Sequence, residues 1–138
     1  MEKTLNLFKI FVSAIGTGIT YLIGDWDTAL IVLAIFVAMD YITGVLVAWI
    51  NNTLNSEVGF KGLAKKALIL VILVVAVCLD RLLGNTGWVF RTLVCYFYIA
   101  NEGISILENA GNLGLPIPTK LRNALEQLED KEEVNDQE

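Results

Sequence analysis

The sequence predicts an all-α fold: an integral membrane helical bundle of four transmembrane helices, followed by a short amphipathic helix. Composition is the first observation, since the 138 residues are 55% hydrophobic and only 18% charged, against about 25% charged in a soluble domain. The second is that four segments approach the ~20 apolar residues that a helix needs to cross a bilayer. The third is that glycine, asparagine and aspartate, which favour turns, separate these segments.

The four apolar segments set the expected boundaries. We expect helices at about residues 5–23, 28–50, 64–83 and 88–108, within a transmembrane domain of residues 1–112. The third contains the most lipid-like run, ALILVILVVAVCL. Polar residues interrupt the first, and an interfacial position for it would leave three spans instead of four.

The C-terminal part is suited to water. Residues 113–130 begin with Pro116 and Pro118, which prevent continuation of the fourth helix. An amphipathic helix is then expected from Thr119 to Asp130, with one apolar face made of Leu121, Ala124, Leu125 and Leu128. Residues 131–138 carry too little apolar surface to fold, so we expect a disordered acidic tail.

The positions of lysine and arginine predict the orientation, because cytoplasmic loops carry an excess of these residues. The expected central loop at residues 51–66 contains Lys61, Lys65 and Lys66, and both ends of the chain carry further basic residues. The turn at residues 24–27 has none. We therefore expect a multi-pass protein of the bacterial cytoplasmic membrane with both termini in the cytoplasm.

Two of the apolar segments carry polar residues spaced three and four apart, which places them on one helix face. Lipid tails cannot form hydrogen bonds, so each face must meet protein or water. Packing between helices and an aqueous lumen in a homo-oligomer both remain open. The stripe of the first segment is Asn6, Lys9, Ser13, Thr17 and Thr20, and that of the fourth is Arg91, Cys95, Tyr98, Glu102, Ser105 and Asn109.

Intramembrane charges are further candidates for assembly or pore lining. Asp40 lies near the middle of the second helix, where a charge costs roughly 2.5–3.5 kcal/mol on insertion scales. It has no evident partner beyond a neighbour such as Thr43, and Gly44 beside it would let another helix approach closely. We expect two ion pairs elsewhere, formed by Asp80 with Arg91 and by Lys9 with Glu102.

Several kinds of chemistry have no support in the sequence. It has no histidine, and its two cysteines, Cys78 and Cys95, lack CxxC spacing, so no metal site is expected. It also lacks a phosphate-binding glycine loop and a Ser/His pair. We expect neither an enzyme nor a cofactor, and no nucleic-acid partner, because there is no basic patch.

Two stretches resemble the phage-lysis and toxin-secretion holins of Gram-positive bacteria and their phages. They are MDYITGVLVAWINNTLNSEVGFKGLAKKALIL, from Met39 to Leu70, and NEGISILENAGNLGLPIPTKLRNAL, from Asn101 to Leu125. The resemblance extends from about Leu30 to Leu128. The positions that match are Asp40, Gly44, Lys65, Lys66, Glu102, Ser105, Glu108, Asn109, Pro116 and Pro118.

This resemblance implies a holin that oligomerises in the cytoplasmic membrane and forms a large non-specific lesion. An endolysin, or a toxin in some relatives, would leave through it for host-cell lysis, without necessary direct contact. An antiholin is a possible further partner. A hypothesis follows in which the polar faces of the first and fourth helices pack together in the dormant state and line water in the lesion.

Two other functions stay open at the level of sequence. A small transporter or ion channel could use the intramembrane carboxylates of Asp40 and Glu102. An antiholin-type regulator could share the helices of a holin and restrain a partner instead of opening the membrane.

Overall fold

The computed structural model describes the backbone of residues 1–133 and the side chains of residues 1–128. Five α-helices make up its regular structure. All-α architecture is therefore confirmed for the described residues. The helices are α1 (Glu2–Ile23), α2 (Thr28–Ile50), α3 (Ser56–Leu82), α4 (Val89–Asn112) and α5 (Thr119–Glu133).

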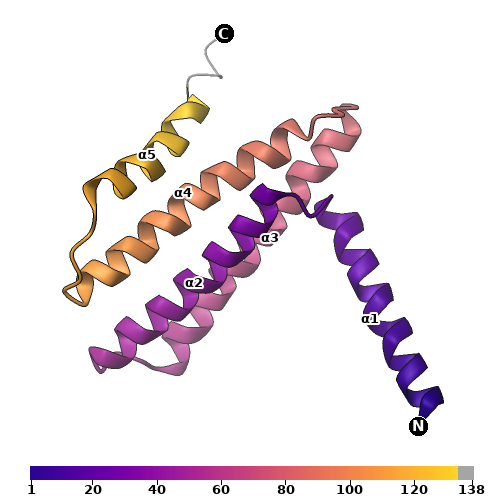
Figure 1. The fold of residues 1–138 in the computed structure, drawn as a ribbon, viewed down its shortest axis with the longest axis horizontal. Coiled ribbons are helices and arrows are strands. Elements are labelled where there is room, and N and C mark those ends of the chain that lie inside the picture. The colour runs from indigo at the N-terminus through magenta and orange to yellow at the C-terminus, as the bar shows by residue number, and fades with distance from the viewer. Residues whose placement is uncertain (134–138) are drawn as a thin grey trace.

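The helices are not arranged as a closed four-helix bundle. Helices α2, α3 and α4 pack together, α5 lies against α4, and α1 points away from the rest (Figure 1). Ile23 at its C-terminal end is the one buried residue of α1. The core consists of Ile23, Leu30, Leu33, Leu73, Cys95 and Ile99.

Helix α3 is longer than the sequence suggested. It begins at Ser56, not near residue 64, because the Asn55 side chain accepts a hydrogen bond of 2.8 Å from the Val58 amide and caps the helix. Glu57 in the first turn adds a favourable charge at this end. The polar stretch expected to be a loop is therefore mostly helical, and the connection from α2 is confined to residues 51–55.

Three helices, α1, α2 and α3, are long and apolar enough to cross a membrane by length and composition. Helix α4 is not among them, although its 24 residues are sufficient in length. Its sequence includes Arg91 and Glu102, which lower its apolar character. The helix whose composition fits a membrane span least well is thus α4, whereas the sequence analysis had identified the first segment as the weakest.

Helix α5 folds back along α4. Leu125 is buried, and a Cβ added at Gly103 of α4 would lie 2.9 Å from both of its methyl groups and 3.0 Å from the Phe36 ring. Glycine at this position therefore permits the close approach of α5. Of the expected apolar face, Leu125 and Leu128 pack inward, whereas Leu121 and Ala124 are exposed. Helix α5 continues to Glu133, and the rest of the expected disordered tail lies outside the described residues.

Candidate functional site

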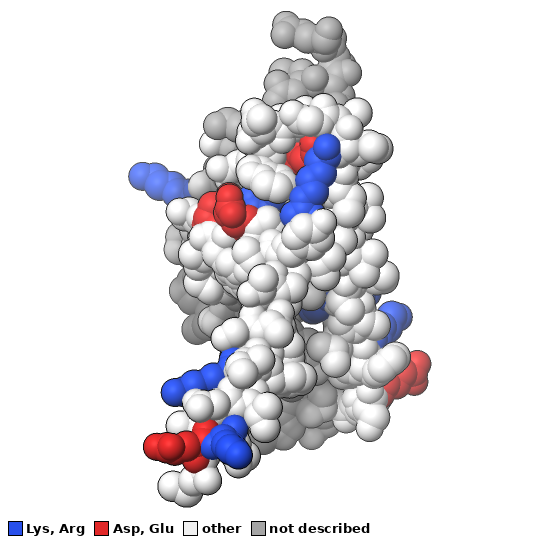
Figure 2. All heavy atoms as spheres, turned by 90° about the vertical axis from the view of Figure 1, so that its right-hand side faces the viewer, with Lys and Arg blue, Asp and Glu red and all other residues white. Residues whose placement is uncertain are grey.

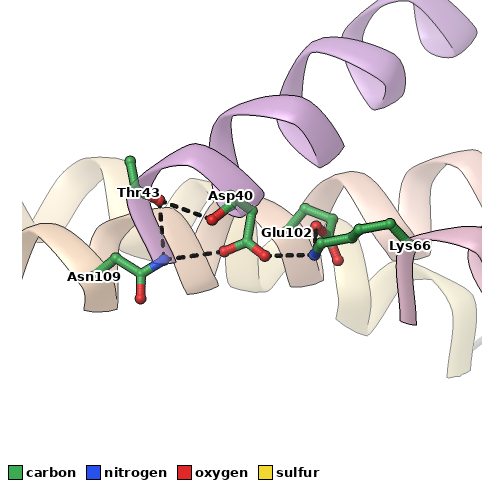
Figure 3. Close-up of polar contacts among 5 residues, drawn as sticks. All are labelled: Asp40, Thr43, Lys66, Glu102 and Asn109. Carbon is green, nitrogen blue, oxygen red and sulfur yellow. Dashed lines mark hydrogen bonds and ion pairs between the residues drawn. The ribbon is translucent and has the colours of Figure 1, made fainter. Parts of the chain in front are cut away.

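A buried charge cluster joins the three packed helices. Lys66 of α3 forms ion pairs with Asp40 of α2 and with Glu102 of α4 (Figure 3). The side chains of Lys66, Asp40 and Glu102 are only 13%, 11% and 7% exposed. A buried charge is costly unless it is paired. One ammonium group therefore offsets the burial of two carboxylates that come from two different helices.

Polar side chains complete the cluster (Figure 3). The Asn109 side-chain amide donates to Asp40 Oδ1 at 3.2 Å and to Thr43 Oγ1 at 2.9 Å. The Thr43 hydroxyl in turn donates to the backbone carbonyl of Asp40 at 3.1 Å. Both carboxylate oxygens of Asp40 are thus bound, one by Lys66 and one by Asn109.

Two clefts open beside the charge cluster. One, of about 230 Å³, is lined by Tyr41, Gly44 and Gly62 together with cluster residues. The other, of about 420 Å³, lies between α3 and α4 and includes Tyr98, Asn101 and Ser105 in its lining. A Cβ added at Gly44 would lie at an ordinary van der Waals distance, 3.8 Å, from the Asn109 amide nitrogen, so this α2–α4 contact has room for a methyl group. The cluster therefore borders open space.

A second polar centre lies at the opposite end of α4. Arg91 is fully buried, and its Nε donates to the Ile23 carbonyl at 2.7 Å. Its guanidinium also pairs with Asp27 at 2.7 Å and donates to the Asp25 carbonyl. Gly24 has a φ of 82°, and a Cβ there would lie 3.0 Å from Arg91 Nε. One arginine thus fixes the whole α1–α2 turn.

Arg91 changes the pKa of the Asp27 carboxyl. The hydrogen bond from Arg91 lowers the pKa of the Asp27 carboxyl below its ordinary value of 3.8, against the opposing effect of partial burial. A hydrogen bond of 2.9 Å from the Leu30 amide to the same carboxylate lowers this pKa further. Asp27 therefore acts both as the N-cap of α2 and as the counterion of Arg91.

Asp80 has a different role from the one predicted. Its carboxylate accepts hydrogen bonds from the backbone amides of Phe90 at 3.0 Å and of Arg91 at 2.8 Å. The Asn85 side chain adds a third at 3.1 Å. Asp80 therefore caps the N-terminus of α4, whose own N-cap residue, Trp88, makes no side-chain cap. The predicted Asp80–Arg91 ion pair is wrong, because the arginine side chain turns toward Asp27.

The other predicted ion pair is also wrong. Lys9 is exposed on α1, which does not pack against α4, and Glu102 pairs with Lys66 instead. Asp40 likewise has a partner where none was expected. Lys66 had been interpreted as a loop lysine that sets topology and as one of the positions that match the holin family, without an ion-pair partner. A signal was present, because Lys66 continues at helical spacing the buried face formed by Ile69, Leu73, Val77 and Asp80.

The two predicted polar stripes have different environments. That of α4 faces protein, since Arg91, Cys95 and Glu102 are buried and Tyr98, Ser105 and Asn109 are half-buried. On α1, Asn6, Lys9, Ser13 and Thr17 are exposed and Thr20 is half-buried. The two stripes do not meet within the chain, so the packing proposed for a dormant state is absent from it. Lys61 and Lys65 lie exposed on α3.

The polar groups of the cluster bind one another, which favours a structural role. In the part of the chain that the structure describes, no group of three or more histidine, cysteine, aspartate or glutamate residues could hold a metal ion. The polar atoms of the cluster bind one another across α2, α3 and α4. This arrangement ties three helices together by charge.

Apolar helices of membrane-spanning length around a buried charge cluster define a membrane protein with several helices. More specifically, the chain belongs to the bacteriophage holin family, whose sequence profile matches residues 17–130. This confirms the family resemblance carried by the two sequence stretches, and it agrees with a non-enzymatic protein.

Several relatives are similar over most of the chain. An uncharacterized 14.9 kDa protein of the nagH 3′ region of Clostridium perfringens is 53% identical over 131 residues, covering 95% of this chain and 99% of the relative. An uncharacterized protein of Clostridium perfringens strain 13 is 50% identical over 134 residues, covering 97% and 99%. A probable holin of Bacillus phage phi105 is 36% identical over 91 residues, covering 66% and 67%. No solved structure matches the chain.

Proposed function

We propose that the protein is a holin that oligomerises in the bacterial cytoplasmic membrane and forms a large, non-specific lesion. A cell-wall hydrolase or a toxin made in the cytoplasm passes through this lesion. The observation that carries the proposal is the match of residues 17–130 to the bacteriophage holin family. The protein contributes no catalysis of its own; its role is to open the membrane.

The outer surface of the helices supports a membrane location. Large apolar side chains are exposed along α2 and α3, and the face that includes α1 is mostly uncharged, with its charged groups in an upper and a lower set (Figure 2). Apolar surface of this extent calls for lipid or another protein. Exposed examples on α2 and α3 are Ile35, Ile42, Leu70, Val71 and Val75.

The buried charges support assembly over simple anchoring. A helix that only anchors a protein gains nothing from Asp40, Lys66 and Glu102, because intramembrane charges are expensive and tend to mark function. Here they hold α2, α3 and α4 as one unit while clefts stay open beside them. Such a unit can associate with copies of itself through its remaining surfaces.

Controlled expression tests the proposal. The chain is induced in bacteria that also produce a cell-wall hydrolase without an export signal of its own. We expect growth to stop abruptly, with lysis and release of a cytosolic enzyme, only when both proteins are present. Cells that produce the hydrolase alone are the control.

Other outcomes would assign the protein to a different class. Continued growth with an intact membrane would contradict a holin. Ion leakage without release of enzyme would indicate a channel or transporter. A delay in the lysis caused by a separate holin, without lysis by this chain alone, would indicate an antiholin.

A further inference from the structure

Helix α1 is held in a direction that leads away from its own bundle. Its last turn is fixed by Arg91, which binds the Ile23 and Asp25 carbonyls, and by Arg81, which donates to the Tyr21 carbonyl. The Arg81 guanidinium also lies over the Tyr21 ring, 4.5 Å from its centre. Side chains of α3 and α4 thus set the exit angle of α1. Thr20, at the end of the polar stripe, accepts a hydrogen bond of 3.1 Å from the Trp26 indole, whereas Asn6, Lys9, Ser13 and Thr17 are exposed.

The packed helices leave an open cleft between α3 and α4. The cleft of about 420 Å³ between α3 and α4 is lined by apolar and polar side chains, including Ile69, Ile72, Tyr98, Asn101, Glu102 and Ser105. Helix α5 contacts a different side of α4, at Gly103, where Phe36 of α2 is also close. The cleft therefore stays open in the described chain, beside the charge cluster.

The polar residues of α1 and those of the cleft lie at similar distances along α1 and α4 from one common contact. The contact of Arg91 with the Ile23 carbonyl supplies a common reference point. Ser13 stands ten residues before Ile23 and Asn101 ten residues after Arg91, about 15 Å along each helix at 1.5 Å per residue.

Further pairs agree with this register. Lys9 and Ser105 each stand fourteen residues from the reference contact, about 21 Å along their helices. Thr17 and Tyr98 also agree to within one residue. Two antiparallel helices that cross the same bilayer would therefore bring these polar side chains opposite one another.

Charge favours the same pairing. The cluster contains the two carboxylates of Asp40 and Glu102 but only the ammonium of Lys66. Lys65 is the other basic residue that lines this cleft, and it is exposed. Lys9, one turn from Ser13 on the stripe, would bring a positive charge to the level of Ser105, next to Glu102. A lysine on an apolar helix gains from an acidic neighbour in the membrane.

We propose that α1 of one copy docks, polar stripe inward, into the α3–α4 cleft of a second copy. This inference rests on the proposed holin function and names the contact that would build its oligomer. The contact is heterologous, because the polar face of α1 and the α3–α4 cleft are different surfaces. Repetition of a heterologous contact gives a closed ring when the rotation between copies allows it. Because Arg91 and Arg81 hold the end of α1 so that it points away from its own bundle, the cleft that receives α1 belongs to a neighbouring chain and not to the same chain.

Disulfide cross-linking between two differently tagged chains tests the contact. Cys78 and Cys95 are first replaced by alanine, and one chain then carries Ser13→Cys while the other carries Asn101→Cys. After co-expression and mild oxidation in the membrane, we expect a disulfide-linked heterodimer bearing both tags. Such a bond needs Cα atoms within about 7 Å. Ile15→Cys, which lies at a similar depth on the opposite face of α1, is the matched control and should give at least fivefold less heterodimer.

Other cross-linking results would overturn the proposal. These are equal yields from the residue 13 and residue 15 variants, dimers only between two Ser13→Cys chains, or an intramolecular bond alone when both cysteines are on one chain. If the cysteine-free chain does not insert, a photo-cross-linking residue at position 13 of the natural chain replaces the cysteines. Adducts with residues 98–105 of a differently tagged copy then support the docking, and adducts elsewhere contradict it.

The lysis assay on the same cells separates this inference from the proposed function. Lysis without the heterodimer would reject the docking contact and leave the holin function standing. Heterodimer without lysis or enzyme release would support the contact and reject the holin function.

Discussion

Lys66 connects the carboxylates of two helices, and both carboxylates would lose their ion-pair partner without it. Replacing it by methionine preserves most of its length and removes the charge. Because breaking a buried ion pair costs about 3–5 kcal/mol, we expect Lys66→Met to lower the free energy of unfolding by about that amount. Unfolding of the purified protein in detergent micelles measures it.

Lys65 supplies the matched control for this experiment. It is adjacent in sequence but exposed, and it forms no ion pair among the described residues. Lys65→Met should leave stability within about 0.5 kcal/mol of the natural chain, the usual range for surface substitutions. Equal losses from the two substitutions would show that the buried cluster does not hold the helices together.

Asp27 gives a prediction for pH. Its pKa is lowered in the folded chain by Arg91, so the ion pair stabilises the fold above pH 3.8, and this contribution is lost as pH falls through the lower folded value. Asp27→Asn keeps an acceptor for the α2 cap but removes the charge. We expect the natural chain to have the higher melting temperature at pH 7, with the difference shrinking below about pH 4. A difference that is constant from pH 7 to pH 3 would contradict the role of this charge.

At the scale of residues, the sequence predicted which side chains are unusual but not how they pair. Asp40, Arg91 and Glu102 were recognisable because they interrupt apolar helices. Their partners could not be read from spacing along one helix, since Lys66 comes from α3 and Asp27 from the turn before α2. Asp80 shows the same limit, because its partners are backbone amides, which no pattern of side chains reveals.

Among the elements, α4 depends on α3 for its first turn. Asp80→Ala would leave the buried amide of Arg91 and the partly buried amide of Phe90 without their acceptor, at a cost of about 1–3 kcal/mol for an unsatisfied buried group. We expect these two amides to exchange hydrogen about five- to a hundredfold faster, which is what a loss of this size allows, as measured by hydrogen exchange in micelles. Amides in the middle of α2 are the internal control and should change much less.

The contact of α5 with α4 depends on the absence of a side chain at Gly103. Gly103→Val would place new atoms against Leu125 and Phe36, with an overpacking cost of about 1–3 kcal/mol. Movement of the Leu125 side chain away from α4 would relieve part of this clash and loosen the contact of α5. Trypsin should then cleave after Lys120 and Arg122 several times faster than in the natural chain. Gly111→Val is a suitable control, because a Cβ there would meet Ile117 at an ordinary 3.8 Å; unchanged cleavage in Gly103→Val would contradict the packing.

The boundaries of the elements show what local sequence could and could not predict. The limits of α2 agree with expectation because an aspartate cap precedes a long apolar run. The start of α3 was misjudged because polarity was taken as evidence for a loop, although the Asn55 cap and the acid after it are signals for a helix start. The direction of α1 could not be predicted, since contacts from Arg81 and Arg91 decide it.

For the whole molecule, we expect α4 to cross the membrane together with α1, α2 and α3. Four spans place both termini on the same side, and the distribution of lysine and arginine predicts that this side is the cytoplasm. The charges of α4 do not oppose a fourth span, because Arg91 and Glu102 are buried among protein groups. Tags at the two ends should resist external protease in intact spheroplasts and be removed after permeabilisation. A tag cleaved at only one end of the chain in intact spheroplasts would instead indicate three spans.

The clamp at the α1–α2 turn also has a consequence for synthesis. Arg91 and Asp27 are separated by 64 residues, so the ribosome completes the turn well before it makes the arginine that fixes it. At about 5–20 residues per second, several seconds pass in which α1 and α2 exist without their clamp. During that interval the contacts of Arg91 do not yet hold the first helix, and its direction relative to α2 becomes fixed by them only after α4 has been made.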